Sequence, residues 1–501
     1  MSNLSELLPA GAGAKSADFV ASGTLGSGVT VVLKTDGTVS VVAETTVPTS
    51  IGSENSFGDP STGTSGLSNI RTIYDPVNSR FIVGWYDGWG YKLRVGTVSG
   101  TSITWGSVTT KPQGYGDLDF AYDPSTGYIL LIEIQTSWDV RVGTISGTTI
   151  TLSSNLWGGR SSVDDGLRIC FDTNSGRFLA FAARDESNSY YLTCVPIKVN
   201  STSSVSIGTA TTVASIATTA YNNALYDTVN GQTLLGFSEK GGSPSTSAFN
   251  LVAVNDSGSG GVSIGSVAKV GTSTDTGGNG IALSLSQNAN GNSGVVLCGT
   301  YAGGTSYPTI GYSFTVSGTT ITPNASGYTF DTIRPQIGSI GICYSPTSDK
   351  YILIWNRQAS NAYYSVASVS VSGTISATNG TLNSSNPYAA GQALTIDTDT
   401  DTNQVFLPYG KDISGTRSAN YKLLTPTYAT SNNTDFIGIT DQAIANTATG
   451  AVIVQGGVSD KVTGLTTGSD YYVQADGTLS TTVSSVPAGR ALSSTSILLE
   501  G

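Results

Sequence analysis

Short runs in which apolar and polar residues alternate occur along most of the chain, and they predict β-strands. Four such runs lie between Asn69 and Thr110, and turn residues separate them. The turn after the first run is DPVNS, in which Pro76 suits the second turn position, and the turn before the fourth run is SGT. Four antiparallel strands in about 45 residues are typical of one blade of a β-propeller.

The turn after the first strand returns along the chain. It begins at Asp75, and the residues in the same slot of the later copies are Asp123, Asp172, Asp227, Asn288, Ser345 and Asp399. These positions are 48 to 61 residues apart, and a second hairpin, VGTVSGTSIT at 95–104, recurs at 142–151 and 314–322. Seven copies at this spacing predict an all-β fold, a seven-bladed β-propeller. Helical solenoids would require helical periodicity, which the sequence lacks.

The two ends of the chain differ from the repeats and set the predicted domain boundaries. Residues 1–18 predict a flexible or docking leader, and residues 19–429 predict the propeller. TSNNTD at 430–435 predicts a linker to a small C-terminal β-domain at 436–501. The seventh repeat lacks a fourth strand, and DGTVSVVAETT at 36–46 resembles the missing one. We therefore expect this N-terminal strand to complete the last blade, because an open propeller leaves unpaired strand edges.

Composition narrows the classes of function. The chain of 501 residues has a formal net charge of −11 and no cluster of basic residues, so we expect no binding to nucleic acid. It contains no His, which removes the commonest general base and metal ligand. No apolar run is long enough to span a membrane, and we recognise no secretory signal at the N-terminus.

The four cysteines have no CxxC spacing. Cys170 and Cys343 occupy equivalent slots in two repeats, which predicts small apolar core residues. Cys170 and Cys194 fall in the same repeat, so a disulfide between them is the open alternative.

The loops between the second and third strands predict the binding face. They are long and differ in every copy, whereas the turns at the opposite end are uniform. Variable loops on a rigid scaffold commonly carry binding sites. Aromatic rings in these loops suit stacking on sugars or contact with a partner protein, and the candidates are Trp89, Trp138, Tyr190, Tyr307 and Tyr363. The alternative is that these rings begin the third strands and pack between blades.

A calcium site is a second hypothesis. Asp397, Asp399 and Asp401 alternate in the segment DTDTDTN, and alternating oxygen ligands in a tight loop often bind Ca²⁺. The same segment also aligns with the ordinary blade turn, in which Asp is only a turn former.

Charged residues near the propeller centre and on the variable-loop face form a third set. Arg71, Asp119 and Arg168 occupy matching slots in three consecutive repeats, and a charge cluster that links neighbouring blades is the favoured interpretation. Asp119 also belongs to a group of acidic residues that could supply the two carboxylates of a glycoside hydrolase, with Asp117, Asp164, Asp165, Asp185 and Glu186. No GxSxG motif is present, and no His exists to activate a Ser or Cys nucleophile.

Beyond these patterns, parts of the sequence resemble virion proteins of tailed bacteriophages, notably marine ones. The hairpin SGTLGSGVTVVLKTDGTVSVV near the start resembles the N-terminal segment of tail-fibre-type proteins, and the VGTVSGTSITWGS repeats are similar to theirs. The C-terminal run from FIGITDQAIANTATG to AGRALSSTSILLEG resembles a terminal module of many such proteins. The resemblance implies a structural virion protein, often oligomeric and host-facing, and it assigns no catalytic residues to this sequence.

We therefore expect a non-enzymatic bacteriophage virion protein, either a tail fibre or receptor-binding protein or a capsid-decorating protein. The expected partners are other virion proteins, a host surface polysaccharide and further copies of the chain, with no membrane and no cofactor apart from the calcium alternative. Two alternatives stay open: a polysaccharide-degrading virion enzyme that uses carboxylates on the propeller face, and a non-viral lectin-like surface protein.

Overall fold

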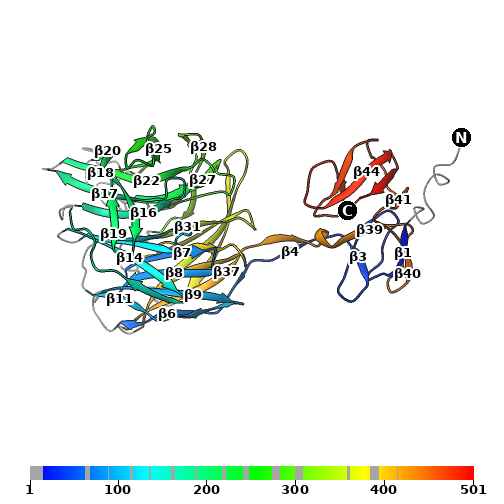
Figure 1. Cartoon of the computed structure of the whole chain (residues 1–501), viewed down its shortest axis with the longest axis horizontal. Coiled ribbons are helices and arrows are strands. Elements are labelled where there is room, and N and C mark those ends of the chain that lie inside the picture. Colours follow the sequence, from blue (N-terminus) through cyan, green and yellow to red (C-terminus); the bar gives the residue numbers. More distant parts are fainter. Residues whose placement is uncertain are drawn as a thin grey trace. The chain divides into compact units, whose positions relative to one another are not determined.

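The computed structural model describes residues 15–61, 68–87, 90–112, 117–134, 137–159, 164–186, 189–216, 222–240, 247–273, 282–299, 308–333, 335–357, 362–383, 394–413 and 416–500. The chain folds into two compact units (Figure 1). The large unit comprises residues 49–426, and the small unit combines residues 1–48 with 427–501. Among the described residues, the one helix is the short 3-10 helix η2 (Asn433–Asp435), which is too short to cross a membrane.

The described part of the large unit forms seven successive antiparallel sheets. The first contains β7 (Ser68–Asp75), β8 (Arg80–Tyr86), β9 (Gly90–Ser99), β10 (Ser102–Trp105) and β11 (Thr109–Pro112). The second contains β12 (Asp117–Tyr122), β13 (Tyr128–Ile134), β14 (Trp138–Ser146) and β15 (Thr149–Leu152). The third contains β16 (Asp164–Asp172), β17 (Arg177–Glu186), β18 (Ser189–Ser201), β19 (Ser204–Ile207) and β20 (Thr211–Ile216).

The remaining sheets repeat this plan. The fourth contains β21 (Asn222–Asp227), β22 (Gln232–Lys240), β23 (Ser247–Asp256), β24 (Val262–Ile264) and β25 (Ala268–Ser273). The fifth contains β26 (Ala282–Gln287), β27 (Ser293–Gly299), β28 (Thr309–Ser317), β29 (Thr320–Pro323) and β30 (Tyr328–Asp331). The sixth contains β31 (Pro335–Ser345), β32 (Lys350–Arg357), β33 (Ala362–Val369) and β34 (Ile375–Asn383), and the seventh contains β35 (Asp397–Asp399), β36 (Gln404–Ile413) and β37 (Thr416–Thr425).

The seventh sheet is completed by strands from the start of the large unit. Both β5 (Ser50–Ile51) and β6 (Asn55–Ser61) pair with β37. Phe57 of β6 has no exposed surface, and its ring packs against those of Trp85 in the first sheet and Phe406 in the seventh.

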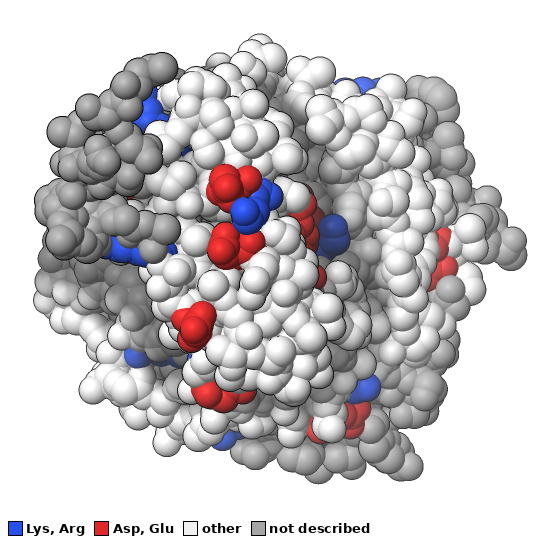
Figure 2. Space-filling view, turned by 90° about the vertical axis from the view of Figure 1, so that its right-hand side faces the viewer, with Lys and Arg blue, Asp and Glu red and all other residues white. Residues whose placement is uncertain are grey.

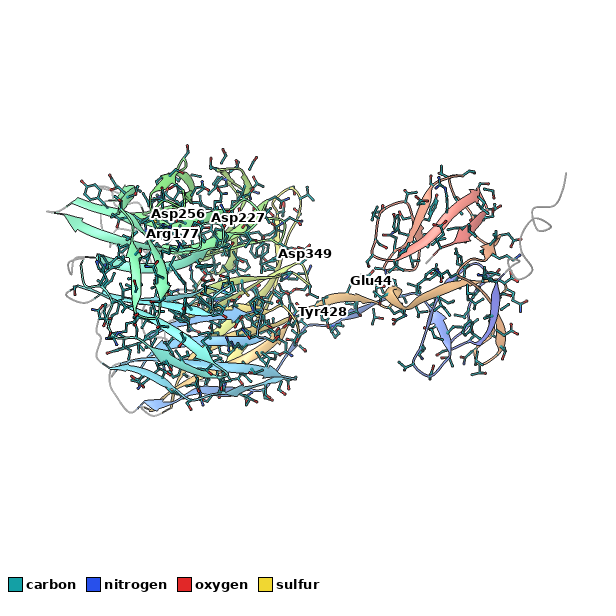
Figure 3. The ribbon with its side chains drawn as sticks, viewed as in Figure 1. Glu44, Arg177, Asp227, Asp256, Asp349 and Tyr428 are labelled. Carbon is teal, nitrogen blue, oxygen red and sulfur yellow. The ribbon has the colours of Figure 1, made fainter. Side chains whose placement is uncertain are left out.

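This pairing corrects the prediction that residues 36–46 complete the last sheet. Within that range, β3 (Val39–Val41) pairs with β2 (Thr30–Leu33) in the small unit. The next strand, β4 (Glu44–Val47), pairs with β38 (Tyr428–Ser431), which occupies part of the predicted linker (Figure 3). The error arose because a DGT turn followed by a short strand has the same local pattern wherever its pairing partner lies.

The first strands of successive sheets contact one another in the order β7, β12, β16, β21, β26, β31 and β35, and β35 contacts β7 again. The side chain four residues before each recurring turn residue lies on the first strand of its sheet. In three sheets it accepts a hydrogen bond from a backbone N–H group on the first strand of the following sheet. Asp119 accepts from Ile169 at 2.8 Å, Ser284 from Ile342 at 3.2 Å, and Thr395 of the last sheet accepts from Thr72 of the first at 2.7 Å. These bonds satisfy donors on an inner edge strand that has no strand partner on that side.

The repeated turns also join neighbouring sheets. Hydroxyl or amide groups just before one turn donate to a carboxylate of the preceding turn: Tyr122 to Asp75 at 2.9 Å, Gln287 to Asp227 at 3.0 Å and Tyr74 to Asp401 at 2.9 Å. The last of these bonds again connects the seventh sheet with the first. Asp75 and Asp227 of the recurring slot therefore shape their own turns and also tie two sheets together, whereas in the seventh turn Asp401 makes the contact between sheets.

The repeated SGT hairpin has the corresponding role on its side of each sheet. The glycine of this hairpin lies at positive φ. Its carbonyl oxygen accepts a hydrogen bond from the side chain of the residue that begins the second strand of the preceding sheet. The pairs are Arg80 with Gly147 at 2.8 Å, Gln232 with Gly318 at 2.8 Å and Gln404 with Gly100 at 2.9 Å. Arg177 makes the equivalent bond to Gly258 and an ion pair of 3.7 Å with Asp256 (Figure 3).

The small unit contains two five-stranded sheets. One has the order β1-β40-β39-β2-β3, with β1 (Ser16–Val20), β39 (Phe436–Thr440) and β40 (Thr449–Val454). The other has the order β41-β45-β44-β42-β43, with β41 (Val458–Ser459), β42 (Asp470–Val473), β43 (Leu479–Ser480), β44 (Pro487–Ser493) and β45 (Ser496–Leu499). We call the first sheet the split module, because its strands come from both ends of the chain. We call the second sheet the C-terminal module.

The two modules have the same strand register. Val32 pairs with Ser40 and with Phe436 beside a bulge, and Tyr472 pairs with Ser480 and with Pro487 beside the same bulge. Their hairpins agree as well, because Thr38 and Thr478 each bond to the carboxylate two residues earlier. The small unit is thus one five-stranded module present twice, and the large unit is inserted between the third and fourth strands of the first copy.

All four cysteines are buried and free, so the predicted core role is confirmed and no disulfide links Cys170 with Cys194. The Sγ atom of Cys170 lies 3.3 Å from the Thr233 hydroxyl, and burial raises the pKa of the Cys170 thiol to about 12. These thiols are therefore unreactive packing residues.

Candidate functional site

A cavity of about 610 Å³ runs along the first strands of the large unit. All seven first strands contribute to its wall, from the layer that contains Arg71 and Asp119 to the repeated turns at Pro76 and Pro124. Pockets of this size commonly hold small ligands.

One layer of the cavity wall is charged. Arg71 and Asp119 form an ion pair with Nε and Oδ1 2.9 Å apart, and both side chains are about 95% buried. Arg168 also lines the cavity. Burial and the charge of Asp119 raise the pKa of Tyr91, and the charges of Arg71 and Arg168 oppose this rise. The predicted linkage of neighbouring sheets by this cluster is confirmed for Arg71 and Asp119, since the second oxygen of Asp119 binds the backbone of the third sheet.

The guanidinium group of Arg71 has an unpaired hydrogen-bond donor. It is only 4% exposed, and its Nη2 atom has no hydrogen-bond partner among the described residues. An unpaired buried donor is costly, so an acceptor from a ligand or from water would be stabilising here. The cavity therefore offers a cationic donor to a small anionic or polyhydroxyl group.

Asp397 lines the same cavity. Burial raises the pKa of its carboxyl group to about 6, although backbone N–H groups of Tyr74 and Thr398 donate to it at 2.7 and 2.8 Å. The raised pKa leaves a larger protonated fraction near neutral pH than an exposed carboxyl group would have.

The predicted calcium ligands do not act together. Both oxygens of Asp397 hold backbone N–H groups, those of Asp399 hold its own turn, and Asp401 accepts bonds from the hydroxyls of Tyr74 and Ser79. No group of three acidic or sulfur ligands that could hold a metal ion occurs in the described part of the chain. The structure does not support the calcium hypothesis, because each carboxylate already serves a turn or a sheet contact.

The predicted aromatic residues have different positions. Trp138 is fully buried and packs edge-on against Trp157 at 5.9 Å, so the structure does not support a ligand-stacking role for it. Tyr363 is partly exposed and stacks on the buried Trp355 at 5.9 Å, so its binding role stays a prediction. The rings of Trp89, Tyr190 and Tyr307 lie outside the described residues, as do the side chains of Asp117, Asp164, Asp165, Asp185 and Glu186.

A buried ionic cluster in the second sheet was not predicted. Lys111 of β11 contacts Glu133 and lies 3.1 Å from Asp139, which is also held by Arg141 through two bonds of 2.9 Å. Burial alone would raise the pKa of Asp139, but the hydrogen bond from Arg141 and the charge of Lys111 hold it below its ordinary value. No local motif marks this cluster, because it depends on a strand from the neighbouring first sheet.

Charged side chains are sparse on the face shown in Figure 2, where most of the described surface is uncharged. This agrees with the low content of charged residues, 11% of the chain. The described residues on this face form no continuous basic patch of the kind that nucleic-acid binding requires.

Comparison with known proteins leaves the family open. No family model and no curated protein matches the chain. Among solved structures it is similar to AofleA from Arthrobotrys oligospora, with 11% identity over 72% of this chain and 96% of that one and a TM-score of 0.42. It is also similar to the Cps50 (Swd1) β-propeller domain of Myceliophteria thermophila, with 10% identity, coverage of 74% and 99% and a TM-score of 0.42.

A third similar structure is the NanB sialidase of Streptococcus pneumoniae, with 10% identity, coverage of 73% and 70% and a TM-score of 0.41. The chain is thus an all-β protein whose structural neighbours include β-propellers. At TM-scores below 0.5, these likenesses carry no argument about function.

Proposed function

We propose that the chain is a virion structural protein of a tailed bacteriophage, in which a closed seven-bladed β-propeller binds a host surface glycan or a neighbouring virion protein. The seven sheets are the blades, and β5 and β6 complete the last one. The contacts between the seventh and first sheets use the same three kinds of hydrogen bond as the other sheet contacts. This equivalence supports closure of the ring.

One observation carries the virion proposal. The two terminal segments that resemble bacteriophage proteins lie far apart in the sequence, yet they fold into one unit of two matching modules. The resemblance therefore falls on a complete structural unit. The propeller is inserted into this unit, as expected for a binding domain carried by a common base.

The cavity beside Arg71 supports a binding role for the propeller. The unpaired Nη2 donor of Arg71 suits a carboxylate or hydroxyl group of an acidic polysaccharide. The Arg71→Lys variant keeps the charge but loses the planar donor, so we expect the folded variant to bind acidic glycans on an array more weakly. Equal binding by both proteins would exclude this site.

The virion assignment is tested on particles from a lysate of the host that carries this sequence. Gold-labelled antibodies against the chain are expected on tail tips, fibres or capsids. Particles without label would overturn the virion proposal and favour a lectin-like surface protein.

A second candidate is a polysaccharide-degrading enzyme, and the raised pKa of Asp397 in the cavity is the observation that favours it. Release of reducing ends from a host polysaccharide, abolished in an Asp397→Asn variant that still folds, would establish this candidate. Absence of release by the unchanged protein would leave the binding proposal alone.

A further inference from the structure

The split module and the C-terminal module can be compared position by position. Leu33, Ile437 and Val454 of the split module correspond to Val473, Ala488 and Leu499 of the C-terminal module. The three C-terminal side chains are 0 to 2% exposed. Leu33 is 42% exposed, and Ile437 and Val454 are only partly buried. At these three positions the face is therefore covered in the C-terminal module and open in the split module, whereas Val31 and Val452 of the same face are buried in a separate cluster.

The cover of the C-terminal module comes from the split module itself. Val32, Ile439 and Ile453 lie on the opposite face of the split module and share one apolar core with Val473 and Leu499. The Thr30 hydroxyl adds a hydrogen bond of 2.6 Å to the carbonyl of Gly477. The two modules thus pack head to tail, with one face of the split module against the opposite kind of face on the C-terminal module. A further module can repeat this kind of contact.

The uncovered face, defined by Leu33, Ile437 and Val454, borders an apolar groove. The groove has a volume of about 740 Å³. Phe19 and Phe436 contribute aromatic rings to one wall, and Val486, Pro487 and Leu499 of the C-terminal module form the other. Its chemistry matches the buried face of the C-terminal module, which accepts branched aliphatic side chains.

We propose that the uncovered face docks a third five-stranded module, carried by a separate polypeptide, that presents branched aliphatic side chains at the positions of Val32, Ile439 and Ile453. The packing of the split module on the C-terminal module is the template for this interface. The proposal rests on the structure of the small unit, and it holds whether or not the propeller binds glycans.

A second copy of this chain fits the uncovered face less well. The free face of its C-terminal module carries Tyr472 and Arg490 where the split module has Val32 and Ile439, and Asp470 replaces Thr30. Arg490 and Asp470 form an exposed pair 3.8 Å apart. Docking would desolvate these charges, so this face is suited to end a stack of modules and not to continue it.

The test converts that terminal face into the proposed partner. The full-length variant Asp470→Thr, Tyr472→Val, Arg490→Ile and Leu498→Ile presents the apolar face of the split module on the C-terminal module. We expect sedimentation velocity to show concentration-dependent association of this variant, whereas the unchanged protein shows none through this face. Adding Leu33→Asp should weaken the association about tenfold or more, because one half-buried leucine is lost from the interface.

Val77→Asp is the matched control, because Val77 is an exposed aliphatic residue of the large unit, at 68% exposure. It should leave the association unchanged, and thermal unfolding of each variant confirms that the small unit folds. A folded four-residue variant that does not associate, or association that is insensitive to Leu33→Asp, would overturn the proposal. Association of the unchanged protein that depends on Leu33 would also overturn it, since the occupant would then be a second copy.

Discussion

Asp75 shows how a single repeated residue serves several partners. Its first oxygen accepts the N–H of Val77, and its second accepts bonds from Asn78, Arg80 and Tyr122, the last of which belongs to the next sheet. The sequence predicted the turn, because Asp followed by Pro is a local signal. It did not predict the bond to Tyr122, because that contact exists only after two sheets pack together.

Replacing Asp75 with Ala should therefore destabilise the large unit by about 3–5 kcal/mol, since Arg80 would remain as a buried charge without its carboxylate. Asp36→Ala is the control, because Asp36 shapes an exposed hairpin turn and its removal should change the free energy of unfolding little. Urea unfolding followed by fluorescence gives both values. Similar losses in the two variants would contradict the role of Asp75 between sheets.

The raised pKa of Asp397 predicts a pH dependence of stability. Its folded pKa of about 6 is above the ordinary value of 3.8, so the folded state holds the proton more tightly than the unfolded chain. Its contribution to stability is therefore largest below pH 4 and is lost as the pH rises to 6, by about 2–3 kcal/mol. The difference between the unchanged protein and Asp397→Asn in urea unfolding should shrink over this range as the pH rises. A constant difference from pH 4 to 7 would contradict the raised pKa.

At the scale of elements, the strands of the repeats were predictable from their alternating pattern and turn residues. The strand that completes the seventh sheet was not, because β6 has the sequence NSFGDPS, with one large apolar residue and no repeat signal. The hairpin at 34–38 was assigned to the wrong sheet for a related reason. Its true counterpart at 474–478 lies 440 residues later, and only a comparison of the two chain ends would have shown it.

Phe57 tests the role of β6. Phe57→Ala removes a fully buried ring from the contact between the first and seventh sheets and should destabilise the large unit by about 3–5 kcal/mol. Val371→Ala, at a fully exposed site, should be neutral. Hydrogen exchange should show faster exchange in β6, β7 and β37 of the Phe57 variant. Unchanged exchange in these strands would contradict the assignment of β6 as the closing strand.

At the scale of the whole molecule, the two units have separate cores. The buried residues of the small unit form two clusters that include no residue of the large unit. The polar segment at 430–435 predicts a domain boundary, whereas the pattern of the N-terminal segment predicts a strand of the propeller. Local patterns could not reveal that one domain interrupts another, because this depends on pairing between the two ends of the chain.

Removing residues 49–426 and joining Pro48 to Thr427 through a short Gly/Ser loop should give a folded small unit, because β4 and β38 already pair as neighbours. Cooperative thermal unfolding and dispersed amide NMR signals would establish this. A chain of the same residues with Val32→Asp is the control, and it should not fold, because Val32 lies in the core shared by both modules. A disordered spectrum from the unmodified small unit would contradict its independence.

The insertion also has a mechanical consequence. Two chain segments connect the large unit to the small unit, because the chain enters the large unit after Pro48 and returns at Thr427. A pulling force on the large unit is shared by both connections, and a single proteolytic cut in either one leaves the large unit attached. A domain held by one linker would be released by the same cut.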